Sequence, residues 1–188
     1  MTDNKISKKR IFLIDGYALL FRAHFALIRN PLITSYGLNT SALFGFINQI
    51  LKIIRDEKPE YIVCAFDSKE KTFRHKLYKK YKANRPEMPE ELQTQLPYLW
   101  SILDKMNMPV IKKVGYEADD IIGTLAVKAQ ENGLISYIVS GDKDFMQLIN
   151  VKIFLYAPGT KKHHIQLFTI LIKLNKNGVF LQKKLLIF

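Results

Sequence analysis

The sequence predicts an α/β fold, a doubly wound parallel sheet flanked by helices, because short apolar runs alternate with longer segments of helical period. The apolar runs are rich in β-branched and aromatic residues, as expected of buried parallel strands, and cover 11–14, 61–66 and 135–140. Apolar residues recur at helical spacing over 40–57, 92–106 and 118–132. Pro59 and Gly133, which follow two of these segments, are typical of helix ends.

Composition narrows the class of protein. The 188 residues carry 29 Lys and Arg against 17 Asp and Glu, a net charge of +12, and such an excess favours a polyanionic partner, most often nucleic acid. Cys64 is the only cysteine, which excludes a disulfide framework and a cysteine-built zinc site. No apolar stretch approaches the roughly 18 residues of a membrane span. We therefore expect a cytoplasmic protein without a membrane partner.

The charges are distributed unevenly along the chain. Residues 145–188 contain seven Lys and no acidic residue, and residues 69–85 contain eight basic residues against the single acid Glu70. The proline-punctuated stretch 69–97 therefore looks like an excursion from the sheet. We expect one domain over residues 1–160, with this excursion inside it, followed by a separate Lys-rich apolar tail over residues 161–188.

Acidic side chains follow the predicted strands. Asp15 and Asp67 come directly after two of them, and Asp142 follows the third after Gly141. Ligands bind at the carboxyl ends of strands in an open parallel sheet. Asp144 lies two residues further on and can turn back to the same place. The start of the third predicted helix adds three acids, namely Glu117, Asp119 and Asp120.

Seven carboxylates on one rim would require cations. At about 4 Å and an effective dielectric constant near 20, each like-charged pair costs about 4 kcal/mol. Oxygen ligands select hard ions, so Mg²⁺ or Mn²⁺ is expected, and two such ions could activate water and stabilise the leaving oxygen of a phosphodiester. Taken singly, an Asp after a strand more often caps a helix, and the four histidines have no metal-ligand spacing with these acids. The coincidence of three strand ends with a helix start favours the metal site.

The basic excursion interleaves its cations with aromatic residues. Phe73, Tyr78 and Tyr81 stand among the lysines and arginines, a pattern that offers base stacking beside phosphate contacts. Six residues recur at three- and four-residue steps and predict one helical face: Arg74, Leu77, Tyr78, Tyr81, Lys82 and Arg85. A Lys-rich run is often only a solvated face, but this composition favours contact with nucleic acid.

These motifs together resemble the 5′-nuclease family, in particular the N-terminal 5′→3′ exonuclease domain of bacterial DNA polymerase I. The similar segments are Leu-Ile-Asp-Gly at 13–16, Ala-Phe-Asp at 65–67, Phe-Arg at 73–74, Tyr-Lys-Lys-Tyr-Lys-Ala-Asn-Arg at 78–85, Gly-Tyr-Glu-Ala-Asp-Asp at 115–120 and Gly-Asp-Lys-Asp-Phe at 141–145. The segments 35–40 and 44–46 also resemble the family. The similarity covers about residues 9–160.

The resemblance implies a PIN-like (resolvase-like) parallel sheet with a helical arch, and it assigns roles to individual residues. It implies that two divalent metals are bound, directly or through water, by Asp15, Asp67, Glu117, Asp119, Asp120, Asp142 and Asp144. It implies catalytic roles for Arg74 and Lys82, which would orient and polarise the scissile phosphate. It implies DNA contacts by Thr40, Lys79, Lys80, Tyr81 and Arg85.

The implied activity is hydrolysis of DNA phosphodiesters in replication and repair, which removes 5′ flaps, nicked-strand ends and RNA primers. The sequence lacks the family's later acidic motif and its helix-hairpin-helix, and it contains no polymerase portion. We therefore expect an incomplete second metal site and a truncated or frameshifted product. Two alternatives remain at this point, namely a DNA-binding remnant that cannot cut and a PIN-type ribonuclease.

Overall fold

A five-stranded parallel sheet forms the centre of the structure, a computed structural model that describes residues 9–156. The strand order is β3-β2-β1-β4-β5, and every neighbouring pair is parallel. The strands are β1 (Arg10–Asp15), β2 (Tyr61–Ala65), β3 (Val110–Ile111), β4 (Ile135–Val139) and β5 (Ile153–Tyr156). The predicted α/β class and parallel sheet are confirmed.

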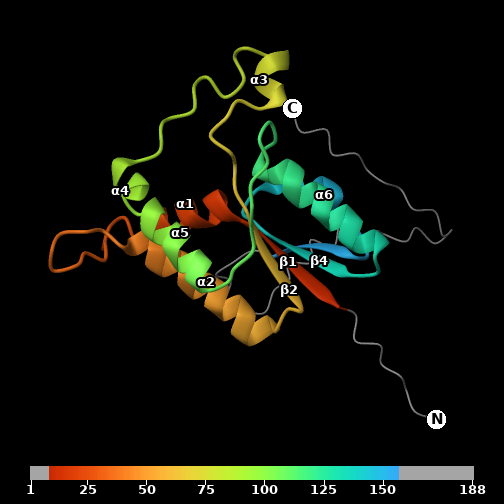
Figure 1. Ribbon diagram of the computed structural model, residues 1–188, viewed down its shortest axis with the longest axis horizontal. Helices are drawn as coiled ribbons and strands as arrows, with labels where there is room; N and C mark the ends of the chain where they lie inside the picture. Colours follow the sequence, from red (N-terminus) through yellow and green to blue (C-terminus); the bar gives the residue numbers. More distant parts are fainter. Residues whose placement is uncertain (1–8, 157–188) are drawn as a thin grey trace, which may run out of the picture.

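Helices cover both faces of this sheet (Figure 1). The helices are α1 (Gly16–Ala26), α2 (Ser41–Glu57), α3 (Phe73–Leu77), α4 (Glu90–Gln93), α5 (Leu96–Lys105), α6 (Ala118–Glu131) and the 3₁₀ helix η1 (Lys143–Leu148). Helices α1, α2 and α5 lie on one side and α6 on the other. The helix predicted over 92–106 is divided into α4 and α5, because Pro97 occupies the first turn of α5, where proline begins a helix readily.

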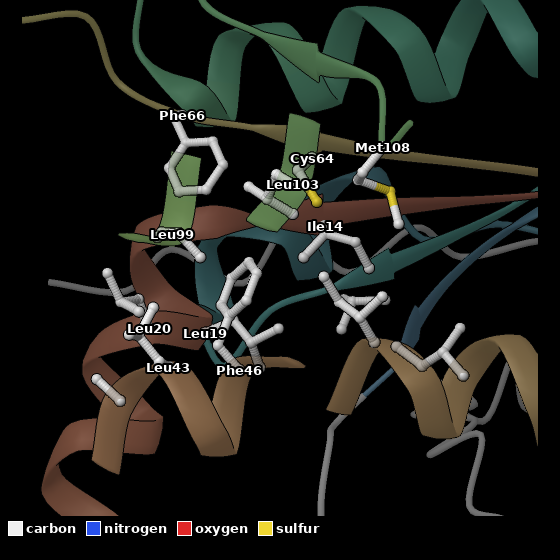
Figure 2. Packing of buried hydrophobic residues seen from close by; sticks show 14 of the residues in the cluster. Ile14, Leu19, Leu20, Leu43, Phe46, Cys64, Phe66, Leu99, Leu103 and Met108 are labelled. Atoms are coloured by element: carbon white, nitrogen blue, oxygen red, sulfur yellow. The ribbon is translucent and has the colours of Figure 1, made fainter. Parts of the chain in front are cut away.

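The side chains of the central strand β1 point alternately into two buried clusters, one on each face of the sheet. Phe12 and Ile14 point into the cluster shared with α1, α2 and α5, whereas Leu13 between them packs against α6, as the period of two in a strand requires. Figure 2 shows Ile14 in the first cluster, with Phe46 of α2 and Leu103 of α5 also in that cluster. These buried layers fix where each strand ends and therefore where its terminal carboxylate lies.

Two glycines permit the close packing on which this layer depends. A Cβ atom on Gly16 would stand 2.3 Å from the ring of Phe66, and one on Gly45 would stand 2.7 Å from the Cβ of Ala23. Since such distances lie far inside van der Waals contact, only glycine allows α1 to begin directly after β1 against Phe66. The Asp-Gly motif at the end of β1 is therefore a packing requirement as well as part of the site.

The excursion over 69–97, called the arch segment below, stands apart from the sheet (Figure 1). The prediction of one helical face in it is wrong. Helix α3 ends at Leu77, and residues 78–85 form successive turns in which Lys82 has a left-handed φ of +54°. Neighbouring cations on one helix repel each other, and Leu77 and Tyr78 are exposed and contribute nothing to a core.

The C-terminal end of the arch segment is hydrogen-bonded to α2. Gln95 is fully buried; its side-chain oxygen accepts the Leu43 N–H at 3.1 Å, and its amide donates to the carbonyl of Glu91 at 2.8 Å. Asn39 donates to the carboxylate of Glu91 at 3.3 Å. These hydrogen bonds position the C-terminal end of the arch segment against α2 and the residues that precede it.

Between residues 9 and 156 no helix has the length and apolar character needed to cross a bilayer. The proposed tail at 161–188 and the boundary at 160 lie outside the described residues and stay predictions.

Candidate metal and nucleic-acid site

Three acidic residues stand at the carboxyl ends of three adjacent strands, and we call them the rim. Asp15 ends β1, Asp67 follows β2 and Asp142 follows β4. Asp15 caps α1 by accepting the Ala18 N–H at 3.1 Å, and its other oxygen accepts the hydroxyl of Ser140 at 2.9 Å. The predicted meeting of these three strand ends at one edge of the sheet follows from the observed strand order.

The carboxylates of the rim form no ion pair among the described residues. Burial raises the pKa of Asp15, and the negative charges of Asp67 and Asp142 raise it further against the opposing hydrogen bonds. No lysine or arginine in the described range 9–156 forms an ion pair with any of these three residues. A bound cation would relieve this repulsion.

A second group of carboxylates, Glu117 and Asp120, lies at the start of α6 and accepts hydrogen bonds from three residues of the arch segment. We call these two acids, together with Arg74, Tyr81 and Lys82, the clamp. Arg74 donates to both oxygens of Asp120 at 2.7 and 2.8 Å. The buried Glu117 accepts from Lys82 Nζ at 3.0 Å and from the hydroxyl of Tyr81 at 2.9 Å. The bidentate geometry of Arg74 gives this pairing direction as well as charge.

The opposite charges of the clamp stabilise the ionised forms of Asp120, Arg74 and Lys82. The hydrogen bond from Arg74 holds the pKa of Asp120 below its ordinary value, and the same bond raises the pKa of Arg74. Burial opposes the charge of Lys82, but its hydrogen bond to Glu117 and the attraction of that carboxylate outweigh this cost and raise the pKa of Lys82. The electrostatics of the clamp are therefore opposite to those of the rim.

The rim and the clamp adjoin each other. Asp67 accepts the Ala118 N–H at the beginning of α6 at 2.6 Å. A small cavity between them is lined by residues of both, among them Asp67, Lys82, Arg85 and Glu117. However, within residues 9–156 no three acidic, histidine or cysteine side chains already stand together as metal ligands. Protein cations hold Glu117 and Asp120, and the role of the seven carboxylates as metal ligands stays a prediction.

The two remaining predicted ligands are placed differently. Asp119 accepts the Asp120 N–H at 2.8 Å, and burial together with the charges of Asp120 and Glu117 raises the pKa of Asp119. Asp144 is exposed, and its N–H donates to Asp142 at 2.8 Å. Asp119 belongs with the acidic start of α6, and Asp144 lies beside the end of the rim.

The predicted DNA-contacting residues fall into two places. Lys79, Lys80 and Arg85 are exposed on the arch segment, whereas Tyr81 is turned toward Glu117. Thr40 is the N-cap residue of α2, and its hydroxyl donates to the carbonyl of Leu32 at 3.1 Å. The cations of the arch segment are therefore divided between exposed ones and those in the clamp.

Sequence reasoning missed two residues that shape the site. Ser140 donates to Asp15 and accepts the Asp142 N–H at 3.1 Å, so one hydroxyl ties together two residues of the rim. His75 accepts the Thr72 N–H at 3.1 Å and packs edge-on against Tyr81, with ring centroids 5.2 Å apart. A polar residue at the end of an apolar run was the one signal for Ser140, and the three-residue spacing of a capping box was the one for His75.

Comparison with known proteins identifies the family of this chain. The family model described as the 5′-3′ exonuclease N-terminal resolvase-like domain matches residues 10–175. DNA polymerase I of Caldicellulosiruptor bescii is 42% identical over 152 residues, which make up 81% of this chain and 18% of the relative. A 5′-3′ exonuclease of Aquifex aeolicus is 39% identical over 150 residues, 80% of this chain and 51% of the relative. This chain therefore spans only part of the length of these relatives.

Solved structures share the fold. A bacteriophage T5 5′-exonuclease with bound divalent zinc ions superposes with a TM-score of 0.60 at 22% identity, over 79% of this chain and 55% of that one. The bacteriophage T5 flap endonuclease in a complex with DNA and metal ions also has a TM-score of 0.60, at 20% identity, over 79% of this chain and 54% of that one. Family match, relatives and fold agree, and the chain belongs to the 5′-3′ exonuclease family through its N-terminal resolvase-like domain.

Proposed function

We propose that this chain is a divalent-metal-dependent 5′→3′ exonuclease and 5′-flap endonuclease that hydrolyses DNA phosphodiesters during replication and repair. The observation that carries the proposal is the uncompensated rim beside a strongly basic arch segment. The acids would hold metal, and the cations would hold the phosphate backbone. Its bacterial relatives process DNA by their names, so we place its action on the DNA of the bacterial cytoplasm.

The rim fits a hard divalent cation. Its side chains offer carboxylate oxygens, which suit Mg²⁺ or Mn²⁺. Burial raises the pKa of Asp15, and the charges of Asp67 and Asp142 raise it further, so a bound cation would stabilise the ionised carboxylate. We infer that Asp15, Asp67 and Asp142 hold the first ion and that Asp144 and Asp119 contribute to a second. Glu117 and Asp120 would join that second site once Lys82 and Arg74 have turned from them to the substrate phosphate. When bound, such an ion lowers the pKa of its water and neutralises charge on the phosphate.

Residues of the clamp would act on the substrate. Lys82 and Arg74 present their charged groups next to the acids of α6, so each can move from a carboxylate to a phosphate oxygen over a short path. There they would orient the scissile phosphate and stabilise the charge that develops on it. Tyr81 and Arg85 would guide the 5′ strand, while Lys79, Lys80 and Thr40 contact its backbone.

A flap-cleavage assay tests this proposal. Purified chain is incubated with a 5′-flap duplex in Mg²⁺, in Mn²⁺ and with a chelator, beside the variants Asp67→Ala and Asp142→Ala. We expect metal-dependent products in the unmodified chain and none in the variants, with binding of the flap retained. Unchanged cleavage by both variants would refute the assignment.

Two alternative functions are outcomes of the same experiment. Salt-sensitive binding of the flap without cleavage in either metal would identify a DNA-binding module that cannot cut. Preferential cleavage of single-stranded RNA would identify a ribonuclease. A matched control is Asp104→Ala, because Asp104 is an exposed acid at the far end of α5 and belongs to neither the rim nor the clamp.

A further inference from the structure

A second hollow borders the rim, on the side of α5 and β3. Its volume of about 740 Å³ lies within the range of roughly 300–1,000 Å³ usual for small-molecule sites. Asp67 of the rim lines it, so the hollow adjoins the proposed metal site. The other residues on which the argument depends are Tyr17, Ser68, Lys69, Trp100 and Lys112.

Two lysines line this hollow, Lys69 and Lys112, and neither forms an ion pair within residues 9–156. Lys112 Nζ lies 3.5 Å from the centroid of the Trp100 ring and 5.7 Å from that of Phe66. Burial lowers the pKa of Lys112, and the positive charge of Lys69 lowers it further. Because neither lysine is held in an ion pair by the acids of the lining, Asp67 and Glu70, both ammonium groups are available to an anion.

The rest of the lining suits a flat aromatic group with a polar attachment. Trp100 packs edge-on against Phe66 at 4.7 Å between centroids, and Tyr17 packs edge-on against the same ring at 5.2 Å. The hydroxyl oxygen of Ser68 is buried without a hydrogen-bond partner among the described residues, which is costly unless something pairs with it. The hollow thus combines stacking surfaces, an unpaired hydroxyl and two cations.

We propose that this hollow binds a nucleoside 5′-monophosphate, with its base against Trp100 and Tyr17 and its phosphate at Lys69 and Lys112. The inference rests on the proposed function, which brings a 5′ strand to Asp67. Aromatic surface beside cations is the combination that binds single nucleotides of a strand. The terminal nucleotide of an uncut 5′ strand and the released mononucleotide offer the same chemistry, so either could be the natural occupant.

Trp100 makes the test direct, because it is the only tryptophan in the sequence. Its fluorescence is followed while the full chain, without added metal, is titrated with thymidine 5′-monophosphate, with thymidine and with inorganic phosphate. We expect a saturable change with the monophosphate and much weaker binding of the other two. Lys112→Met and Lys69→Met should each weaken the monophosphate about tenfold, as expected for loss of a charge-assisted contact. The matched control Lys113→Met removes a neighbouring exposed lysine that does not line the hollow and should bind normally.

Equal binding of thymidine and its monophosphate, or unchanged affinity in both lysine variants, would overturn the inference. Single-stranded oligonucleotides with a 5′-phosphate or a 5′-hydroxyl separate the two sources. Tighter binding of the phosphorylated oligonucleotide than of the monophosphate supports the strand end, and preference for the free monophosphate supports the product. Flap cleavage by the same preparation is scored separately: a cleaving chain that binds no monophosphate refutes the hollow alone, and a binding chain that does not cleave refutes the proposed function alone.

Discussion

The rim and the clamp place acidic residues side by side under opposite electrostatic conditions. In the rim, the half-buried Asp15 faces two further carboxylates, and burial raises its pKa. In the clamp, Asp120 is held by Arg74, whose hydrogen bond lowers the pKa of Asp120. The contrast shows that acidity in the sequence does not by itself define a metal site. What distinguishes the two groups is whether a protein cation already occupies the carboxylates.

The largest expected effect comes from neutralising the rim. Asp15→Asn should reduce flap cleavage by about 10³-fold, because metal catalysis supplies several kcal/mol. The same substitution should stabilise the metal-free fold by about 1 kcal/mol, since it removes a half-buried charge that two neighbouring acids repel. Cleavage rates and chemical unfolding measured on one preparation check both signs. A variant that is less stable without metal would contradict the description of the rim.

Removing the Lys82 ammonium group from the clamp should have the second-largest effect on cleavage. Lys82→Met should lower the cleavage rate about 10²-fold, as expected for loss of one group that stabilises transition-state charge. Its effect on flap affinity should be small by comparison. The control is Lys79→Met, which removes an exposed arch lysine and should alter affinity and its salt dependence with little change in the rate at saturating substrate. Equal rate losses in the two variants would assign Lys82 to binding only.

Breaking the Arg74–Asp120 pair should have a moderate effect on stability. Asp120→Asn keeps an acceptor for the Glu117 N–H but loses the charge that Arg74 binds. After solvent screening of this partly exposed pair we expect a loss of about 1 kcal/mol in the free energy of unfolding. A double-mutant cycle with Arg74→Met isolates the pairwise energy. Simple additivity of the two substitutions would show that the pair contributes nothing.

The smallest expected effect is a change with pH in the free energy of unfolding. Because the pKa of Asp120 is lowered from 3.8 in the folded chain, its contribution is present above pH 3.8 and is lost as the pH falls through the lower, folded value. Asp15 behaves in the opposite way: its raised pKa makes ionisation destabilising as the pH rises above 3.8. Unfolding of unmodified chain, Asp120→Asn and Asp15→Asn across this range should therefore give differences of opposite sign. Parallel profiles would remove the distinction between rim and clamp.

The sequence predicted the sheet and the rim better than the arch segment and the clamp, for a physical reason. Buried parallel strands such as β1 are continuous apolar runs, and their ends place Asp15 and Asp67 at one edge whatever the loops do. The 3.6-residue spacing from Arg74 to Arg85 resembles a helix, but those residues bind acids from another element. Contacts between residues 35 to 46 positions apart leave no periodic signal.

Helix α1 and strand β3 were not predicted from the sequence, because one is apolar on most sides and the other is very short. Helix α1 is apolar around much of its circumference, with Tyr17 and Phe21 packed against the core as well as its buried face, so no helical stripe stands out. Strand β3 has only two residues, too few for any pattern. The nucleotide hollow is assembled from α1, the end of β2, α5 and the end of β3, and such a site depends on tertiary packing that no local motif encodes.

Binding of Mn²⁺ to the metal-free chain, measured by calorimetry at neutral pH, tests the central contrast most directly. The rim should bind the ion with an affinity that falls at least about tenfold in Asp67→Ala, since one of its carboxylates is lost. The Asp120→Asn variant should retain this binding, because its carboxylate is already occupied by Arg74. Equal loss in the two variants, or binding that neither affects, would contradict the separation of an open rim from a closed clamp.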